Sequence, residues 1–417
     1  MINTTRDVVH EVMARGQKAP LYEGLPTRLV RARELSGMNT AELGRLARLS
    51  RTTVANIEEG KTAPGIDTVE RLAAALHVSP AWLGFGEDAL VDLSTHRFAP
   101  GFDPLTLSSE LSTLVNGTGG HIDQMYLYID LDGAAKWRAL VDSYKGLPTR
   151  PLAEALLEHS ARQPLDVVGL GCGVGQHEVG LVKHLLEARS KGIRLYLVDI
   201  SHSLLGAAYH QAKDALEGTG VRVLTIEGDF NRLPSFISLL GGQEMGARRR
   251  VACMFGYTFT NLGNEVLFVR NSLVGFQPGD FLVLDLTKTY APAERPDEVR
   301  AKDPALLRQR SADFRNKADQ FLTGPIRRYL REPTEFEIDS VLDTTSCPVP
   351  GSYGIEYRVT VRTPGNSAAR HFTVGHAKRY DIPKLAECLR QEGWDLLDEY
   401  PYGDAIPCSV CLFQKRR

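Results

Sequence analysis

The sequence has no apolar run that approaches the roughly 18 residues a membrane-spanning helix requires. It also lacks the basic stretch followed by a short apolar stretch that opens a secretory signal peptide. These two absences predict a cytoplasmic protein that neither enters nor crosses a membrane.

Net charge is nearly absent as well. The 49 Lys and Arg residues almost balance the 51 Asp and Glu residues, which leaves a formal charge of −2. A whole-chain charge of this size gives no sign of a polyanionic partner. Any binding of nucleic acid has to rest on a local excess of positive charge.

Cysteine is scarce, with six residues in 417. They are scattered, several of them inside apolar runs, so buried reduced thiols are predicted. Cys408 and Cys411 have the spacing of half a metal site, but no second pair and no nearby histidine cluster completes it. We therefore expect no metal.

The stretch around which the chain is organised is 165–175, LDVVGLGCGVG. An apolar run breaks into glycines at 169, 171, 173 and 175, and a helical pattern follows. This order predicts a buried strand that turns tightly into a helix, the first βα unit of an open α/β sheet. Glycine permits a positive φ angle and lets a ligand approach the backbone without striking a Cβ atom.

Two further apolar runs end in carboxylates. The first, IRLYLVDI, ends in Asp199 and Ile200, and the second, VRVLTIEGDF, ends in Gly228, Asp229 and Phe230. An acid at the tip of the second strand can accept hydrogen bonds from both ribose hydroxyls. Asp229 can accept one from an adenine amino group. The three strand ends therefore predict a site for an adenosyl ligand at the carboxyl edge of the sheet.

The glycine spacing argues against a dinucleotide, because GxGxxG needs its third glycine on the helix and the residues from Val174 to Gln176 do not place one there. GxGxG with acidic tips on the next two strands resembles the S-adenosyl-L-methionine pocket of class I methyltransferases. In that family an acid usually stands two residues before the first turn glycine, and here Gly169 stands there. The cofactor-binding residues that the resemblance implies are Gly169, Gly171, Gly173, Gly175, Asp199, Ile200, Gly228, Asp229, Phe230, Phe255 and Gly256.

Residues 25–87 carry the phasing of five short helices, and this part resembles the helix-turn-helix domain of the phage-repressor (Cro/C1, XRE) family. The matching residues are Leu43, Ser50, Thr53, Val54, Ile57, Glu58, Gly60, Lys61, Pro64, Leu72, Ala75, Leu76, Val78, Trp82 and Leu83. Thr40 and Arg48 depart from the family, which commonly has a glutamine and a turn glycine at these positions.

Ser50 is placed to cap the second helix of the helix-turn-helix pair, whose first turn would enter the major groove of DNA. The residues expected to contact double-stranded DNA are Arg51, Thr52, Thr53, Asn56 and Lys61. From Arg28 to Lys61 seven basic residues face four acidic ones, a small local surplus of the right sign. The alternative is a bundle kept for dimerisation. A homodimer is expected in either case.

From about residue 121 to 417, the order of features resembles the histidine-specific methyltransferase of ergothioneine biosynthesis. The segments that carry this resemblance are LPTRPLAEALL (147–157), LVDIS (197–201), IEGDF (226–230), FGYTFTNL (255–262), PGD (278–280) followed by LVLDLTK (282–288), and DEYPYGD (398–404). In that family an inserted lobe, here the β-type runs between 325 and 374, covers the methyl-transfer site.

The resemblance implies catalytic roles for Tyr257, Asn261 and His376, and substrate contacts for Tyr144, Tyr257, Asn261, Tyr402 and Asp404. Each role has a simpler alternative. Asn261 can satisfy its own backbone in a turn, His376 can be an ordinary sheet histidine, and Tyr144 can pack between lobes.

The acceptor is expected to differ from histidine. Aligning Arg379 and Tyr380 with the family's Lys-Tyr/Phe pair puts Gly375 and Ala377 where that family has a glutamate and a serine. Without the carboxylate that receives a substrate ammonium group, a different small metabolite is predicted. The nucleophilic atom, N, O or C, stays open.

Two functions from different classes follow. The first is an S-adenosyl-L-methionine-dependent methyltransferase acting on a small-molecule metabolite, with a helix-turn-helix domain for dimerisation or DNA binding. The second is a transcriptional regulator whose methyltransferase-like domain senses S-adenosyl-L-methionine or a metabolite. Methylation of DNA itself lacks support, because FGYTFTNLG follows the fourth strand in place of an Asn-Pro-Pro-Tyr or Pro-Cys loop.

A chain of 417 residues is longer than one domain usually runs, so several cores are expected. The predicted fold is multidomain: an all-α helix-turn-helix bundle plus a Rossmann-like α/β methyltransferase sheet with an inserted α+β lobe. The expected segments are an N-terminal extension (1–24), the helix-turn-helix domain (25–87), a linker (88–120), the cofactor-binding core with its entry helices (121–290), the inserted lobe (291–380) and a return to the core (381–417).

Overall fold

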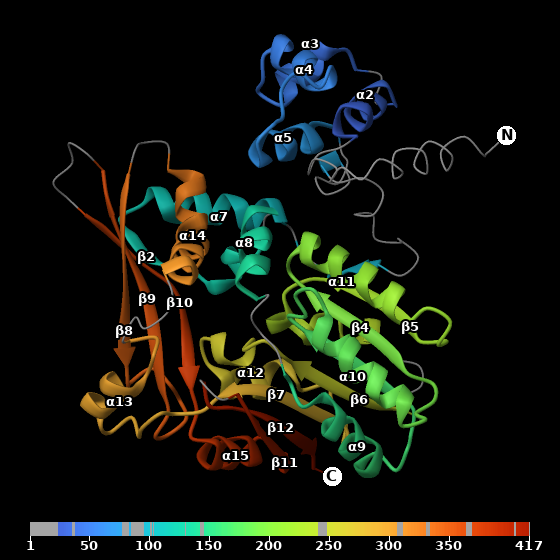
Figure 1. The fold of residues 1–417 in the computed structure, drawn as a ribbon, viewed down its shortest axis with the longest axis vertical. Coiled ribbons are helices and arrows are strands. Elements are labelled where there is room, and N and C mark those ends of the chain that lie inside the picture. Colours follow the sequence, from blue (N-terminus) through green and yellow to red (C-terminus); the bar gives the residue numbers. More distant parts are fainter. Residues whose placement is uncertain are drawn as a thin grey trace. The chain divides into compact units, whose positions relative to one another are not determined.

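The computed structural model divides the chain into two compact units, Met1–Leu90 and Val91–Arg417. It describes residues 24–35, 38–76, 83–84, 96–100, 102, 104–129, 131–141, 146–240, 248–306, 312–330, 334–363, 369–403 and 406–416. Figure 1 shows the helices of the first unit and the two sheets of the second.

The first unit is a bundle of short helices. Its described helices are α2 (Leu25–Leu35), α3 (Thr40–Leu46), α4 (Arg51–Glu58) and α5 (Ile66–Leu76). Apolar side chains from all four meet in one core, which includes Leu29, Leu43, Val54 and Leu72. Most of the predicted fifth helix, with Val78 and Trp82, lies outside the described residues.

Local chemistry fixes the ends of these helices. Asn39 and Glu42 form a capping box at the start of α3, and the Ser50 hydroxyl accepts a hydrogen bond from the Thr53 amide at the start of α4. The predicted Ser50 cap is therefore confirmed. Arg48, in the turn between α3 and α4, has a φ of 55°, the left-handed region that the family's usual glycine occupies without strain.

The larger sheet of the second unit has eight strands in the order β1-β5-β4-β3-β6-β7-β12-β11. It is parallel from β1 to β7, whereas β12 runs antiparallel to both of its neighbours. The strands are β1 (His96–Phe98), β3 (Leu165–Leu170), β4 (Arg194–Asp199), β5 (Arg222–Glu227), β6 (Arg249–Met254), β7 (Phe281–Thr287), β11 (Trp394–Tyr402) and β12 (Cys408–Lys415).

Helices cover both faces of this sheet, which explains why the middle residues of its central strands, such as Val167, Leu197 and Ala252, are apolar and buried. One buried core forms under α9 (Thr149–His159), α10 (Gln176–Glu187) and α11 (His202–Ala215). The other forms under α12 (Glu265–Ser272), α15 (Ile382–Gln391) and the 3₁₀ turns η4 (Phe230–Ser235) and η5 (Ile237–Leu240). The predicted Rossmann-like α/β architecture is confirmed.

A second sheet has the order β2-β10-β9-β8. Its strands are β2 (Gly119–His121), β8 (Glu335–Asp343), β9 (Tyr353–Arg362) and β10 (Arg370–Arg379). Side chains of α7 (Pro104–Asn116), η3 (Gln124–Leu127) and α14 (Ala312–Tyr329) share a core with this sheet, against which Trp137 and Leu140 of α8 (Leu131–Val141) also pack. A short helix, α13 (Pro296–Lys302), precedes α14. The expected α+β lobe is present.

Residues 88–120 were expected to form a linker, but their described part forms two strands and a helix. This part contributes β1 to the edge of the large sheet and α7 and β2 to the small one. The sequence signal was weak because β1 and β2 have three residues each, too few for an apolar period. The small sheet therefore draws on two separate places in the sequence, with β2 between β1 and β3 and the other three strands between β7 and β11.

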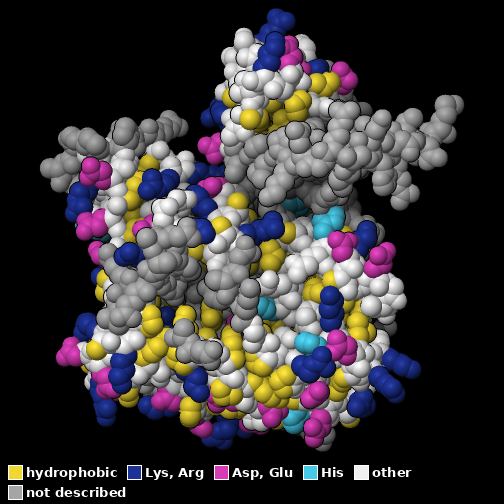
Figure 2. Space-filling view, in the orientation of Figure 1, with side chains coloured by type: hydrophobic (Ala, Val, Ile, Leu, Met, Phe, Trp, Pro, Cys, Tyr) yellow, Lys and Arg dark blue, Asp and Glu magenta, His cyan; other side chains and the backbone are white. Residues whose placement is uncertain are grey.

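Within the described residues, no helix combines the length and apolarity needed to cross a membrane. Figure 2 shows Lys and Arg side chains interspersed with Asp and Glu over the face of the second unit in view.

Candidate active site

The carboxyl ends of the parallel strands surround a cavity of about 280 Å³, which we call the strand-tip pocket. It lies where the strand order reverses, because β3 has β4 on one side and β6 on the other. Open α/β sheets bind ligands in the crevice at such a point. After β3 the chain turns through Gly171, Gly173 and Gly175, with φ angles of 67°, 55° and 72°. Only glycine adopts this series without strain.

Asp199, at the tip of β4, is 5% exposed, and its carboxylate is hydrogen-bonded to the turn after β3 and to the turn after β4. One carboxylate oxygen accepts from the Gly173 amide at 2.8 Å and the other from the Ser201 amide at 2.9 Å. The Ile200 amide also donates to this carboxylate, which still leaves a lone pair that can accept from a ligand hydroxyl. Burial raises the pKa of Asp199 to about 6, although the backbone hydrogen bonds by themselves would lower this pKa.

Asp229 follows β5 and is partly exposed to the strand-tip pocket. The amide and the side chain of Asn231 both donate to its Oδ1 atom. This arrangement orients the carboxylate and directs Oδ2 away from Asn231. Burial raises the pKa of Asp229 above its usual value.

The structure brings most of the predicted cofactor residues together. Those that line the pocket are Gly171, Gly173, Asp199, Ile200, Asp229, Phe230, Phe255 and Gly256. Gly169, Gly175 and Gly228 do not line it. A Cβ atom there would meet Glu178, Ala208 or Ala99, at 2.7, 3.1 and 2.4 Å respectively, so these three glycines make room for neighbouring protein atoms. Cofactor binding by the whole set stays a prediction.

Glu178 of α10 supplies a carboxyl group where the class I family usually has its strand acid. A Cβ atom on Gly169 would lie 2.8 Å from Glu178 Oε1, and Glu178 is 1% exposed. Its Oε2 atom has no hydrogen-bond partner. Burial raises the pKa of Glu178 to about 8, so the neutral carboxyl predominates at pH 7.

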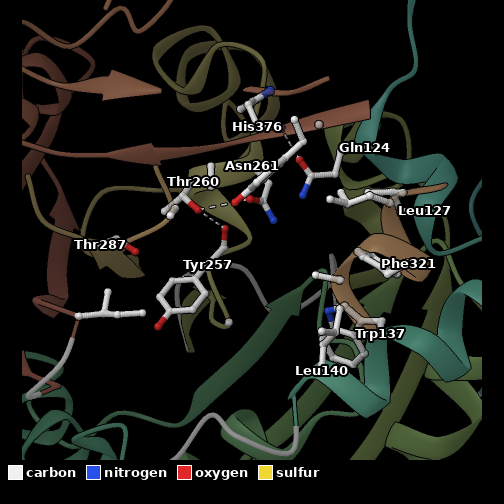
Figure 3. A pocket seen from close by; sticks show the side chains of 18 of the residues that line it. Gln124, Leu127, Trp137, Leu140, Tyr257, Thr260, Asn261, Thr287, Phe321 and His376 are labelled. Carbon is white, nitrogen blue, oxygen red and sulfur yellow. Dashed lines mark hydrogen bonds between the residues drawn. The ribbon is translucent and has the colours of Figure 1, made fainter. Parts of the chain in front are cut away.

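A larger cavity of about 700 Å³ lies between the two sheets, and we call it the two-sheet cavity. Tyr257, Thr260 and Asn261, on the loop after β6, lie on one side of it (Figure 3). Leu127 of η3, Trp137 and Leu140 of α8 and Phe321 of α14 lie on the other side. The residues that line both cavities are Gln124, Tyr128, Trp137, His177, Gly256, Asn261 and His376.

A buried carboxylate on β7 organises the loop after β6. Asp285 accepts from the Gly256 amide at 3.0 Å and from the Tyr402 hydroxyl. Burial raises the pKa of Asp285 to about 6. Tyr257, the next residue of the loop, has a φ of 67°, an uncommon backbone conformation for tyrosine. Its hydroxyl lies 3.6 Å from the Cys408 sulfur.

His376 of β10 lines both cavities, but its ring is anchored. Its Nε2 atom lies 2.7 Å from the Leu262 carbonyl oxygen and donates to it. Burial lowers the pKa of His376, so the ring is neutral at pH 7. Asn261 accepts a long hydrogen bond from Thr260, 3.4 Å between oxygens, and its side chain lines both cavities.

Gly375 and Ala377, the predicted departures from the histidine-specific family, both line the two-sheet cavity. A Cβ atom on Gly375 would lie 3.1 Å from the Gln124 side-chain oxygen. A neutral amide from η3 therefore occupies space that a longer side chain at 375 would need. The cavity has no carboxylate at this position.

Several lining residues were not predicted. His177, in the first turn of α10, lines both cavities, and burial lowers its pKa to about 4. Asp285 could have been found as the single acid in the apolar run LVLDLTK. Trp137 and Phe321 carry no sequence signal, because aromatic residues on helices usually indicate core. Tyr144 and Asp404, predicted to contact the substrate, lie outside the described residues.

Cys408 and Cys411 lie three residues apart on β12, so their side chains point to opposite faces of the sheet. Cys408 lines the two-sheet cavity and Cys411 is in the core under α12 and α15. This pair cannot hold one metal ion together.

In the first unit, the predicted DNA-contacting residues lie on and after α4. Arg51, Thr52 and Lys61 are exposed, while Thr53 and Asn56 are partly exposed. Lys61 forms an ion pair of 2.5 Å with Glu59, both side chains being more than half exposed. An exposed pair of this kind adds little stability.

Comparisons with known proteins gave matches of two kinds. Residues 29–83 match the family model described as helix-turn-helix. The P22 c2 repressor, solved with a synthetic operator, is 25% identical over 15% of this chain and 96% of its own, with a TM-score of 0.15. No curated protein sequence is significantly similar to this chain.

Solved methyltransferases align with much of the chain. The CcbJ methyltransferase of Streptomyces caelestis is 13% identical over 71% of this chain and 100% of its own, with a TM-score of 0.36. The 1,6-didemethyltoxoflavin-N1-methyltransferase of Burkholderia thailandensis, solved with S-adenosylhomocysteine, is 13% identical over 76% of this chain and 93% of its own, with a TM-score of 0.37. These methyltransferases are proteins that the second unit resembles, whereas residues 29–83 match the helix-turn-helix family model.

Proposed function

We propose that the second unit is an S-adenosyl-L-methionine-dependent methyltransferase that acts on a small-molecule metabolite. The observation that carries the proposal is that the strand-tip pocket and the two-sheet cavity share walls. A cofactor site and an acceptor site need this arrangement, because the methyl group has to pass directly between them.

The strand-tip pocket fits the adenosyl ligand in its donor set. Asp199 keeps a lone pair for a ribose hydroxyl, and Asp229 keeps an oxygen for an amino group. Gly171 and Gly173 line this pocket, and a Cβ atom on either would meet Thr258 at 2.8 Å or Trp137 at 2.3 Å, so a side chain there would crowd the turn. The bound cofactor would supply an electrophilic methyl group on a sulfonium.

The two-sheet cavity would hold the acceptor. Its aromatic and apolar side chains exclude water, and Tyr257, Asn261 and Gln124 offer polar groups that orient a ligand. For an acceptor that arrives protonated, we assign Asp285 as the group that takes the proton, because this carboxylate lines the cavity beside the loop after β6 and burial raises its pKa to about 6. The amide of Gln124 and the absence of a carboxylate at 375 favour an acceptor other than an amino acid.

The exposed first turn of α4 supports a second role, binding of double-stranded DNA by the first unit. In the alternative function, the chain is a transcriptional regulator and the second unit senses S-adenosyl-L-methionine or a metabolite.

One experiment separates these functions. The full chain is incubated with methyl-labelled S-adenosyl-L-methionine and a fractionated metabolite extract, with Asp199→Asn as the control. A labelled small product that the control does not form supports the enzyme. Saturable cofactor binding without product, together with a cofactor-dependent shift of promoter DNA, supports the regulator. Absence of cofactor binding contradicts the enzyme and a sensor of S-adenosyl-L-methionine, and leaves only a sensor of another metabolite.

A further inference from the structure

A separate cluster of side chains lies at the edge of the large sheet, outside the residues that line the two cavities. It consists of His96 on β1, His202 at the start of α11 and Glu227 at the end of β5. One nitrogen of each histidine and one oxygen of the glutamate lie within 4.8 Å of one another. The three residues are far apart in the sequence, so only the fold brings them together.

His96 is oriented in the way that metal ligands usually are. Its side chain is 1% exposed, and its Nδ1 atom lies 2.9 Å from the Thr225 hydroxyl. Its Nε2 atom is buried without a hydrogen-bond partner and lies 3.5 Å from Glu227 Oε2. A hydrogen bond from Nδ1–H to a neighbouring oxygen fixes the tautomer that leaves Nε2 free to bind a metal.

An ordinary ion pair does not explain the whole cluster. His202 Nδ1 lies 2.7 Å from Glu227 Oε2, which satisfies these two groups. The buried Nε2 atom of His96 approaches the same oxygen only to 3.5 Å, without a hydrogen bond of good geometry, because His202 already occupies that oxygen at 2.7 Å.

We propose that His96, His202 and Glu227 bind one divalent transition-metal ion, Zn²⁺ in the first instance. Two imidazoles and one carboxylate form a borderline donor set that suits Zn²⁺ and the neighbouring late transition metals, and is unlike the all-oxygen sets of Mg²⁺ and Ca²⁺. Three protein ligands leave a fourth position for water.

The distances are close to those a tetrahedral ion needs. Zinc bonds of about 2.0–2.2 Å separate tetrahedral ligand atoms by about 3.3–3.6 Å. His96 Nε2 and Glu227 Oε2 already fit at 3.5 Å. The 2.7 Å between His202 and Glu227 has to widen, and the His202 side chain, 32% exposed, has space to turn toward solvent.

The ion would tie the edge strand to the strand-tip pocket. Ala99, just after β1, donates its amide hydrogen to the Glu227 carbonyl at 2.8 Å, and Gly228 donates to the Asp199 carbonyl at 2.9 Å. Asp199 and Glu227 are also partners in the ladder between β4 and β5. A metal held by β1, β5 and α11 would therefore stabilise the ends of the two strands that carry Asp199 and Asp229.

The test uses the full chain, stripped with a chelator and dialysed, then titrated with Zn²⁺ by calorimetry and with Co²⁺ by visible absorption. We expect one Zn²⁺ per chain at this site and the intense visible bands of four-coordinate Co²⁺. His96→Gln and His202→Ala should each weaken Zn²⁺ binding at this site about 100-fold or more. Thr225→Val, which removes only the partner of His96 Nδ1, should weaken it about 10-fold.

His159→Ala is the matched control, because His159 pairs with Asp398 at 3.0 Å without a third ligand, and it should leave Zn²⁺ binding unchanged. His202 is partly exposed, so His202→Ala keeps the test valid if His96→Gln does not fold. Zn²⁺ should also raise the Tm of the wild-type chain and not that of His202→Ala. Equal Zn²⁺ affinity and stoichiometry in the wild type and His202→Ala would overturn the proposal.

Discussion

The strand-tip pocket and the two-sheet cavity share walls, yet they are built differently. Backbone turns and strand ends between residues 171 and 263 provide most of the strand-tip pocket. Side chains from η3, α8, α14, β7, β10 and β11 provide most of the two-sheet cavity. The strand-tip pocket depends on residue types that the backbone conformation requires, such as glycine at a positive φ angle. The two-sheet cavity uses ordinary side chains that only the packing of two sheets brings together.

The largest effect should come from filling the glycine turn of the strand-tip pocket. A Cβ atom on Gly173 would lie 2.3 Å from Trp137, on backbone with a φ of 55°. We expect Gly173→Ala to lower the free energy of unfolding of the second unit by about 3 kcal/mol, from overpacking and backbone strain. Urea denaturation followed by tryptophan fluorescence measures this.

Gly218→Ala is the matched control, because Gly218 has a φ of 73° and no atom within 4 Å of the added Cβ. It should lower the free energy of unfolding by only about 1 kcal/mol. Equal losses in the two variants would show that the turn has room for a side chain, which a packed pocket wall does not allow.

A slightly smaller effect should follow from changing the carboxylate that joins two turns. Asp199→Asn exchanges one acceptor oxygen for an amide that faces a backbone donor. We expect S-adenosyl-L-methionine affinity to fall about 100-fold, equivalent to about 2.7 kcal/mol. Calorimetry measures it, with the exposed Asp214→Asn on α11 as control. Unchanged affinity in Asp199→Asn would place the cofactor elsewhere.

The third prediction changes the two-sheet cavity and leaves the strand-tip pocket intact. Tyr402→Phe removes one donor to Asp285, so the free energy of unfolding should fall by about 2 kcal/mol. Cofactor affinity should stay within about threefold, because Tyr402 does not line the strand-tip pocket. Tyr400→Phe, on the same strand, is the control. A large loss of cofactor affinity in Tyr402→Phe would show that the two cavities are not independent.

The smallest effect, counted per pH unit, concerns the buried acid behind the glycine turn. The pKa of Glu178 is about 8 in the folded chain, against an ordinary 4.5 when unfolded. Its contribution to stability is therefore full below pH 4.5 and is lost as the pH rises toward 8, by up to about 1.4 kcal/mol per pH unit. Glu178→Gln should flatten this part of the stability profile, measured by urea denaturation at several pH values.

Glu187→Gln, on the same helix but at its exposed end, should leave the slope as it is in the wild type. Identical slopes in the wild type and Glu178→Gln would mean that Glu178 is ionised in the folded chain.

The strand-tip pocket could be largely predicted from the sequence because its signals are local. A positive φ angle requires glycine, so Gly171 and Gly173 stand out in an apolar run. Gly175 has a positive φ angle as well, but neither it nor Gly169 nor Gly228 lines the strand-tip pocket, so cofactor contacts for these three glycines stay predictions. Beside Gly169 lies Glu178, nine positions later on α10.

The two-sheet cavity was harder to predict, because nothing in the local sequence marks its lining residues. They line the cavity only because of where the fold places them. Trp137 and Phe321 resemble core aromatics, and His177 resembles any polar residue in the first turn of a helix. The described part of 88–120 shows the same limit, since β1 and β2 are too short for a periodic pattern and exist through pairing with β5 and β10.

The sequence by itself determined the α/β order, the glycine turn, the acidic strand tips and the capped helices of the first unit, because each depends on the conformational preferences of a few adjacent residues. The tertiary structure alone decided which distant side chains meet. Gln124 fills the space beside Gly375, Glu178 reaches Gly169, and His96 joins Glu227. Such contacts depend on how sheets and helices pack, and no local pattern encodes them.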